Sequence, residues 1–283
     1  MGIQKRKIFL KKHCPNSAVC PHGKYLADND IGIIWSIPSD YKSDTLHRRR
    51  IHELQRENRK PLLVVEKGFL HRDVYFSIGW NSIVGYGEYH NRNMPSDRFE
   101  RLNIKTKPHH PGRNRKDGYI LLCGQVPWDT QVQHLESYRD WLMKTVEEIR
   151  KVTNREIVYR PHPKQSPGNE MSITRLPGTA ASSKADLEDE FEECHAVVSF
   201  NSNSLVEALI AGIPFFGFDR GSMAFDLANQ DLSRIETPGF PEEPVRMQKL
   251  YDIAYAQWNS DEIKSGEFWK HLMSYPLPYS GDH

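Results

Sequence analysis

Long apolar runs are missing from this sequence of 283 residues. A membrane-spanning helix needs about 18 consecutive apolar residues, and no stretch comes near that length. The basic N-terminus holds only the apolar stretch Ile8-Phe9-Leu10, which is too short for a signal peptide. A myristoylation pattern also fails, because Arg6 stands where that pattern has Ser or Thr. We therefore expect no membrane span and a cytoplasmic protein.

Cysteine is scarce too, with four residues in the chain, and this number excludes a framework of disulfide bonds. Cys123 and Cys194 lie in or beside apolar runs and are expected to be buried thiols. The other two lie in HCPNSAVCPH, where the spacing differs from that of the usual zinc motifs. A loop with free thiols is favoured there, and a metal site stays open at His13, Cys14, Cys20 and His22.

Three familiar site motifs are absent as well. The sequence contains no GxGxxG and no GxxxxGK[ST], so neither a classical dinucleotide-binding fold nor a P-loop is supported. It also has no serine-nucleophile elbow of the hydrolase type.

The charge distribution is the first positive feature. The net charge is only +1, but residues 1–116 contain 23 Lys and Arg against 11 Asp and Glu. Residues 117–283 contain 15 against 26, so the two parts carry +12 and −11. This asymmetry predicts two parts with different roles and a polyanionic partner for the first. The alternative is that these charges only solvate a surface or match the acidic half.

The first half reads as a small α/β domain. Ile31–Ile37 and the almost wholly apolar Pro61–Glu66 are predicted strands. Between them, SDTLHRRRIHELQRENRK has the pattern of a helix with one basic face, so a βαβ unit is expected. Residues 88–118 are polar, basic and interrupted by prolines, which indicates a loop and a linker. We place the boundary near Arg113–Asp117 and predict domains 1–116 and 117–283.

The second half alternates strands and helices. The predicted strands are Tyr119–Cys123, Glu156–Arg160, Ala196–Phe200 and Ile213–Phe218. The predicted helices are Leu135–Val152, Lys184–Glu193, Ser204–Ala211, Met247–Trp258 and Asp261–Met273. This order predicts a doubly wound α/β domain, whose ligands bind beyond the carboxyl ends of its strands. Whether the C-terminal helices pack back on the first domain stays open.

The segment SFNSNSLVE offers the strongest candidate site. A strand ends, small polar residues follow and a helix begins at once, which favours an anion site at the helix N-terminus. Glu207, one turn into the helix, is a candidate partner for ribose hydroxyls. The structural alternatives are a simple N-cap and a solvent-facing Glu207. The candidates in the polar loop are Ser199, Asn201, Ser202, Asn203 and Ser204.

Other polar residues follow neighbouring strands. The turn RPHPK presents Arg160, His162 and Lys164, which suit phosphate oxygens, or are solvated surface charges. Two further strands are followed by the candidates Gly124, Gln125 and Asp219. In the first half, Glu66 ends a buried strand and is placed to act as a base on an acceptor hydroxyl, or it pairs with an arginine.

The motifs YRPHPK and VVSFNSNSLVEALIAGIPFF resemble capsule-polysaccharide and Kdo transferases. The segments EKGFLHRDVYFSIGWNSIVGYGEY and AYAQWNSDEIKSGEFWKHL resemble small glycosyltransferase-like proteins of phages. The resemblance implies two facing Rossmann-like α/β domains of the GT-B type, with the active site in the cleft between them. It implies that the first domain binds the acceptor and the second a nucleotide-sugar, with a UDP-sugar as the first expectation. The residues it implies for the donor are Arg160, His162, Ser202, Asn203, Ser204 and Glu207.

These features together predict a metal-independent glycosyltransferase. Because the first half is basic and the resemblance includes phage proteins, the leading hypothesis is transfer to a hydroxylated or hydroxymethylated pyrimidine in DNA. Glu66 is the expected base, with Asp28 or Asp30 as substitutes, and Arg160 and His162 assist catalysis. Trp80, Tyr86 and Tyr89 are candidates for stacking on the base, or simple core residues. Two alternatives stay open: a capsule or lipopolysaccharide glycan as acceptor, and a non-catalytic DNA-binding protein on a transferase scaffold.

Overall fold

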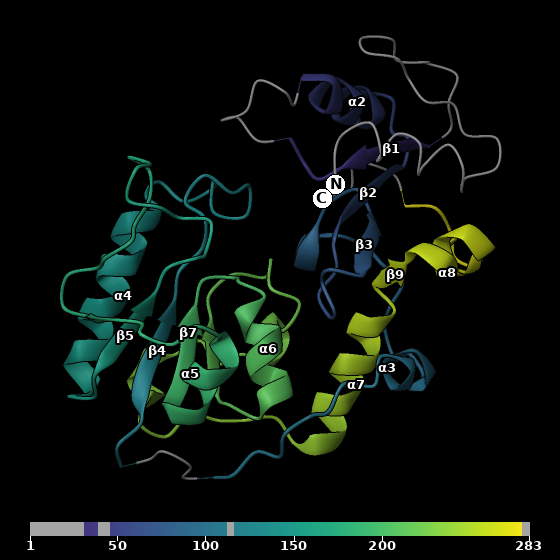
Figure 1. Cartoon of the computed structure of the whole chain (residues 1–283). Helices are drawn as coiled ribbons and strands as arrows, with labels where there is room; N and C mark the ends of the chain where they lie inside the picture. The colour runs from purple at the N-terminus through teal and green to yellow at the C-terminus, as the bar shows by residue number, and fades with distance from the viewer. Residues whose placement is uncertain (1–30, 39–45, 112–115, 279–283) are drawn as a thin grey trace. The chain divides into compact units, whose positions relative to one another are not determined.

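The structure is a computed structural model that describes residues 31–38, 46–111 and 116–278 (Figure 1). The chain divides into two compact units. Unit 1 comprises Met1–Leu102 and Leu250–His283, and unit 2 comprises Asn103–Lys249. Each unit has its own β-sheet and its own hydrophobic core, and each is described by itself.

Unit 1 contains a mixed sheet in the order β1-β2-β3-β9. Strands β1 (Gly32–Trp35) and β2 (Leu62–Lys67) are parallel and are connected through helix α2 (Leu46–Glu57), which is the predicted βαβ unit. Strand β3 (Tyr75–Trp80) runs antiparallel to β2. The short helices η2 (Val84–Tyr86) and α3 (Asp97–Arg101) follow β3.

Strand β2 is almost wholly apolar because both of its faces are covered. Leu63 and Val65 pack in a core cluster with Trp258 and with Phe268 of α9. Leu62 and other buried residues of the sheet pack in a second cluster, against which Ile51 of α2 also packs. The sheet therefore lies between two apolar layers.

The C-terminal segment completes the unit 1 sheet. Helix α7 (Glu243–Ala254) leads into strand β9 (Gln257–Asn259), which pairs antiparallel with β3, and α8 (Ser260–Ser265) and α9 (Glu267–Leu272) follow. The buried side chain of Gln257 accepts hydrogen bonds from the backbone N–H groups of Phe69, at 2.7 Å, and Leu70, at 2.8 Å. The predicted helix Met247–Trp258 is therefore wrong at its end, because Gln257 and Trp258 are held in a strand by distant partners.

Unit 2 contains an all-parallel sheet in the order β6-β5-β4-β7-β8. Its strands are β4 (Tyr119–Cys123), β5 (Ile157–Arg160), β6 (Ala180–Ala181), β7 (Cys194–Ser199) and β8 (Phe215–Gly217). Its longest helix is α4 (Tyr138–Val152), which begins where the Ser137 side chain accepts a hydrogen bond from the Asp140 backbone N–H at 3.1 Å.

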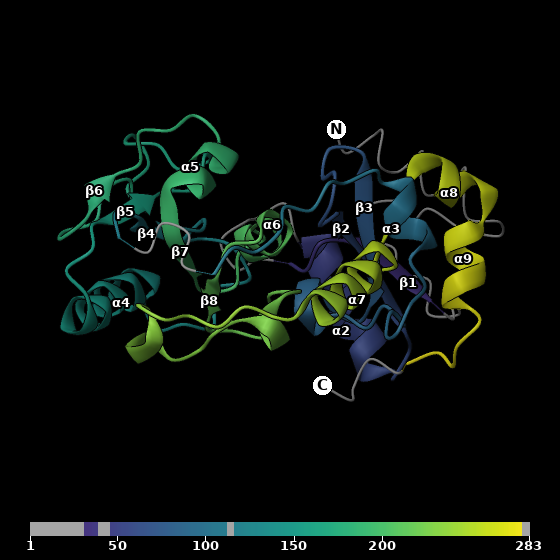
Figure 2. The ribbon, with the colours of Figure 1, turned by 90° about the horizontal axis from the view of Figure 1, so that it is seen from below.

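Helices cover both faces of this sheet, as Figure 2 shows for α4 and α5 (Leu187–Glu193). Leu142, Val146 and Ile149 of α4 pack on the sheet in one core cluster. Helix α6 (Ser204–Ala211) contacts β7 and β8 and ends at Gly212, whose φ of 72° is a left-handed conformation that glycine adopts easily. Two short helices, η3 (Phe225–Leu227) and η4 (Leu232–Arg234), follow β8.

The division into units differs from the boundary at 116/117 drawn from the sequence. Residues after Leu102 already run along unit 2: the backbone N–H of Lys107 donates to Ile210 at 2.9 Å, and the Arg246 guanidinium binds the Lys107 carbonyl at 2.8 Å. At the other end, residues after Lys249 return to unit 1. Both differences arise from contacts between residues far apart in the sequence.

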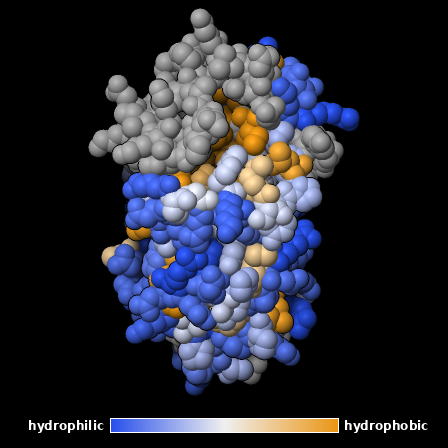
Figure 3. All heavy atoms as spheres, turned by 90° about the vertical axis from the view of Figure 1, so that its right-hand side faces the viewer, coloured by the Kyte–Doolittle hydropathy of each residue, from blue (hydrophilic) through white to orange (hydrophobic). Residues whose placement is uncertain are grey.

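No helix in the described part of the chain is long and apolar enough to cross a membrane. The described atoms on the face shown in Figure 3 are mainly hydrophilic, with hydrophobic residues in small separate groups.

Candidate active site

The candidate site lies at the carboxyl ends of the unit 2 strands. Strand β4 is central: β5 lies on one side of it, and β7 lies on the other. The chain therefore reverses its direction across the sheet between β4 and β7, which is where open α/β sheets bind their ligands. Gln125 follows β4 and Asn201 follows β7, so these two residues flank the reversal point.

A buried network joins the ends of three strands at this point. The Gln125 amide donates to Asn201 Oδ1 at 2.6 Å, and its oxygen accepts from the Asn201 backbone N–H at 3.1 Å. Asn201 Nδ2 donates in turn to Asp219 Oδ1, after β8, at 2.6 Å and to the Gln131 carbonyl at 3.0 Å. Gln125 and Asn201 are 6% and 2% exposed. The network thus fixes the start of the polar loop that leads to α6.

The polar loop bonds largely to itself. Ser202 Oγ accepts from the Ser204 backbone N–H at 3.2 Å, and Asn203 Nδ2 donates to Glu207 Oε1 at 3.0 Å. The backbone N–H of Val206 donates to the Asn203 carbonyl at 2.9 Å. Ser202 and Asn203 are half-buried and Ser204 is buried. Asn203, the N-cap residue of α6, makes no side-chain hydrogen bond to the first backbone N–H groups of the helix. The proposed role of the loop as an anion site stays a prediction.

Arg160, the last residue of β5, is bound inside unit 2. Its guanidinium donates to Ser182 Oγ at 2.9 Å and to the carbonyls of Lys184 and Ala185 at 2.8 and 2.7 Å. It also lies 3.4 Å from a carboxylate oxygen of Glu190, which is buried. These contacts bind the end of β5 to the chain that follows β6.

His162 lies in the turn that follows β5. Its Nδ1 accepts a hydrogen bond from the Lys164 backbone N–H at 3.1 Å. The neutral ring therefore carries its proton on Nε2, which makes Nε2 the donor nitrogen of the ring. His162 is half-buried and Lys164 is exposed.

Two of the predicted site residues, Gly124 and Ser199, have structural roles in the core of unit 2. A Cβ atom on Gly124 would lie 2.5 Å from the Tyr159 hydroxyl, so packing against Tyr159 accounts for this glycine. Ser199 is fully buried, and its hydroxyl donates to the Cys123 carbonyl at 2.9 Å. Burial raises the pKa of the Cys123 thiol to about 12, so this cysteine is not a nucleophile at neutral pH.

Sequence reasoning missed two residues of this site. His134, in the loop between β4 and α4, lies with Nε2 3.3 Å from Asp219 Oδ2. Gln165 donates to the Gln125 carbonyl at 3.0 Å. The available signal was their position in polar loops that follow β4 and β5, the same signal that identified Gln125 and His162.

Glu66 belongs to unit 1, whereas the other predicted site residues belong to unit 2. It lies near the carboxyl end of β2, is half-buried, and accepts a hydrogen bond from the Lys67 backbone N–H at 2.8 Å. Its role as a base stays a prediction. Its proposed substitutes, Asp28 and Asp30, lie outside the described residues.

The proposed base-stacking residues are largely core residues. Trp80 is fully buried and Tyr89 is 2% exposed. The Tyr89 ring fills the space beside Gly79, where a Cβ atom would come within 2.4 Å of it. Neither side chain presents a surface to a nucleotide base, so the stacking hypothesis is wrong for both. Tyr86, in η2, is half-buried.

No group of three or more His, Cys, Asp or Glu side chains among the described residues is arranged to hold a metal ion. The possible zinc ligands near the N-terminus, His13, Cys14, Cys20 and His22, lie outside those residues.

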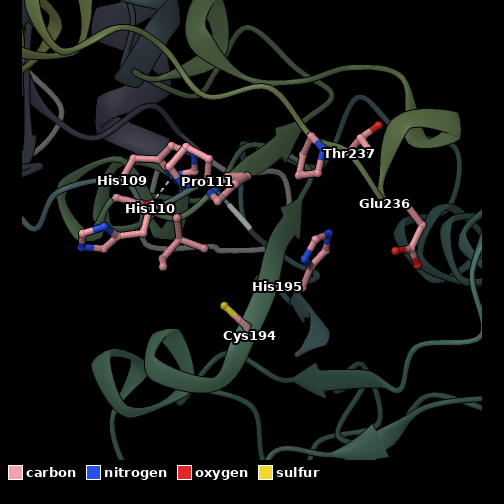
Figure 4. Close-up of a pocket in the computed structure, with 11 residues that line it drawn as sticks. His109, His110, Pro111, Cys194, His195, Glu236 and Thr237 are labelled. Carbon is pink, nitrogen blue, oxygen red and sulfur yellow. Dashed lines mark hydrogen bonds between the residues drawn. The ribbon is translucent and has the colours of Figure 1, made fainter. Parts of the chain in front are cut away.

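A cavity of about 120 Å³ lies at the opposite, amino end of the unit 2 strands, where β7 begins. Figure 4 shows His109, His110 and Pro111 lining it from one segment, and Cys194, His195 and Glu236 from others. Glu236 is an ion-pair partner of Arg155, with 3.0 Å between their side-chain atoms. None of the predicted site residues lines this cavity.

No curated protein sequence matches the chain. Among solved structures, the KpsC β-Kdo 2,4 transferase of Thermosulfurimonas dismutans matches with a TM-score of 0.51 and 17% identity, over 78% of each chain. The KpsC β-Kdo 2,7 transferase of the same organism matches with a TM-score of 0.48 and 17% identity, over 97% of this chain and 90% of the other. The first of these likenesses confirms the predicted fold class, an α/β protein with two sheets, one of them all-parallel, of the GT-B type.

A family model described as "LIC12162 family transferase" matches residues 69–224. The match covers more than half of the chain and includes the polar network at the carboxyl ends of β4, β7 and β8. The chain therefore belongs to the LIC12162 family of transferases.

Proposed function

We propose that this transferase is a glycosyltransferase that takes its sugar from a nucleotide-sugar bound at the carboxyl ends of the unit 2 strands. The observation that carries the proposal is the buried Gln125–Asn201–Asp219 network at the point where the sheet reverses direction. Such a network holds several loops in fixed positions around one ligand site. Membership of a transferase family and a fold similar to that of KpsC support the same reaction class.

The donor site would bind phosphate without requiring a metal ion. His162 donates from Nε2, and Lys164 supplies a positive charge on the same turn. The N-terminus of α6 adds the partial positive charge of a helix, which stabilises the phosphate of the leaving nucleotide. Glu207 orients the ribose through its carboxylate, which Asn203 already holds by a hydrogen bond.

Arg160 has a different role in this proposal. Because its guanidinium is bound to Ser182, Lys184, Ala185 and Glu190, it positions the turn that carries His162 rather than binding the donor.

Glu66 is the proposed general base in unit 1. A carboxylate near the end of a buried strand is suited to accept the proton of an acceptor hydroxyl as that hydroxyl attacks the sugar. Glu66→Gln should abolish transfer and leave nucleotide binding unchanged. Full turnover in that variant would refute the assignment.

The acceptor is proposed to be a glycan of the capsule or lipopolysaccharide class. The likeness to KpsC favours it, and the charge argument for DNA weakens when charges are counted by unit. Over the whole sequence, unit 1 carries +4 and unit 2 carries −3, compared with +12 and −11 for the parts drawn from the sequence. Transfer to DNA stays a prediction with less support, since Trp80 and Tyr89 are buried.

One experiment compares the two acceptors. The protein is incubated with a panel of UDP-, GDP-, TDP- and CMP-sugars, together with capsule or lipopolysaccharide oligosaccharides in one set and DNA containing hydroxymethylated pyrimidines in another. Mass spectrometry then weighs the oligosaccharides and the digested nucleosides. We expect oligosaccharides that are heavier by one sugar and unchanged nucleosides. Heavier nucleosides with unchanged oligosaccharides would restore the DNA acceptor. No transfer to either acceptor, with the donors intact, would refute the proposed activity.

A further inference from the structure

His134 and Asp219 form a histidine–carboxylate pair beside the buried network. His134 Nε2 lies 3.3 Å from Asp219 Oδ2, and the His134 and Asp219 side chains are 48% and 12% exposed. The other carboxylate oxygen, Oδ1, accepts from Asn201 Nδ2 at 2.6 Å and from the Gly221 backbone N–H at 2.8 Å. One oxygen of the carboxylate is thus held by Asn201 and Gly221, and the other oxygen faces His134.

The contact with Asp219 bears on which hydrogen bonds His134 can donate. The contact is an ion pair when His134 is protonated. Both ring nitrogens then carry a proton, so Nδ1 is a donor as well as Nε2. The Phe200 ring, 5.5 Å from the imidazole between centroids, supports the side chain without adding charge.

We propose that His134, oriented by Asp219, binds a phosphate of the nucleotide donor through Nδ1 in its protonated form. This inference rests on the proposed function and adds a residue to its donor site. A protonated His134 would add a charged donor to Lys164, whereas Arg160 is engaged with Glu190 and with the chain that follows β6. A half-exposed imidazole beside the network supplies that charge next to the loop that leads to α6.

Other titratable groups lie on the neighbouring loops, so the test separates His134 from them. Those on the adjacent segments are Asp129, His162, Lys164, Glu207 and Arg220. The ligand's own terminal phosphate also changes charge near about pH 6. The informative quantity is therefore the difference in pH dependence between the wild type and a variant that changes His134 alone.

The experiment measures the dissociation constants of UDP, GDP, TDP and CMP by calorimetry at about pH 6 and about pH 8, a range that brackets the charge change of an ordinary histidine. The variants are His134→Gln, Asp219→Asn and the double variant, with His162→Gln as a comparison within the site. His110→Gln is the matched control, because His110 is an exposed histidine at the opposite edge of the same unit. Thermal unfolding verifies that each variant is folded.

We expect His134→Gln to weaken binding about tenfold at the lower pH, the effect of losing one charge-assisted hydrogen bond, and to have little effect at the higher pH. The double variant should bind no more weakly than the weaker of the two single variants, because the two residues form one contact. His162→Gln and His110→Gln should retain the part of the pH dependence of nucleotide binding that His134 contributes. If His134→Gln binds the nucleotides like the wild type at both pH values, the inference is overturned and the proposed function stands. If the wild type binds none of the four nucleotides, the proposed function is overturned and the inference with it.

Discussion

At the residue scale, the structure distinguishes side chains that build unit 2 from those available to a ligand. Gly124, Ser199 and Arg160 were all candidates for donor binding because each stands at or next to the end of a strand. Gly124 makes room for Tyr159, Ser199 bonds to the neighbouring strand, and Arg160 is an ion-pair partner of Glu190. The polar carboxyl ends of the strands are formed or flanked by Gln125, Asn201, His162 and Asp219.

Gly124→Ala tests the first of these assignments. The added methyl group would meet the Tyr159 hydroxyl at 2.5 Å, so we expect a loss of about 1–3 kcal/mol in the free energy of unfolding. Gly168→Ala is the control, because nothing lies within 4 Å of a Cβ atom there. Denaturant titration of both variants provides the measurement. A fully stable Gly124→Ala that no longer binds nucleotide would show instead that the glycine serves the ligand.

Arg160→Met tests whether the arginine positions the turn or binds the donor. Its removal leaves the buried Glu190 carboxylate without its cation, which costs about 3–5 kcal/mol of unfolding free energy. Adding Glu190→Gln removes the orphaned charge, so the double variant should be more stable than the sum of the two single losses predicts. Denaturant unfolding of the three variants measures this coupling. A stable Arg160→Met with weakened nucleotide binding would support the direct role expected from the sequence.

At the element scale, local patterns identified most of unit 2. The strand Tyr119–Cys123 was predicted with its observed bounds, and α4 begins three residues later than predicted because Ser137 caps it. Strand β9 could not be predicted: its three residues have no pattern of their own and become a strand only by pairing with β3, about 180 positions earlier. The Arg160–Glu190 and His134–Asp219 contacts escaped prediction for the same reason, since each joins separate loops or elements.

The packing of α9 on unit 1 should make stability depend on pH. Burial lowers the pKa of His271 below its usual value, and the positive charge of Arg98 lowers it further. The folded chain therefore binds fewer protons than the unfolded chain as pH falls through the ordinary histidine range, and stability is lost in that direction. His90, whose pKa burial also lowers, adds to the effect.

We expect the free energy of unfolding of the wild type to decrease between about pH 7.5 and about pH 5.5, across the usual histidine pKa. His271→Gln should show a shallower decrease, and the exposed His110→Gln should follow the wild type. Denaturant titrations at a series of pH values measure these slopes. An identical slope in His271→Gln and the wild type would contradict the assignment.

At the scale of the whole molecule, the sequence predicted two α/β parts and a transferase, and both predictions are confirmed. The domain-scale charge asymmetry was less informative, because much of the basic excess belongs to residues 103–116, which are part of unit 2. Composition reports where charges fall along the chain, whereas the units are set by contacts between distant segments. The acceptor was the least predictable feature because it was inferred mainly from that charge.

The central proposal is sugar transfer at the polar carboxyl ends of the unit 2 strands. The most direct measurement is the rate of transfer to a capsule or lipopolysaccharide oligosaccharide, followed by product mass, for the wild type, Asn201→Ala and Asn154→Ala. Asn201→Ala removes the bonds to Gln125, Gln131 and Asp219, whereas Asn154 is exposed. We predict transfer by the wild type and Asn154→Ala, and a loss of at least about tenfold in folded Asn201→Ala, the equivalent of one hydrogen-bonded contact. Wild-type rates in Asn201→Ala, or no transfer by the wild type with any donor, would contradict the account.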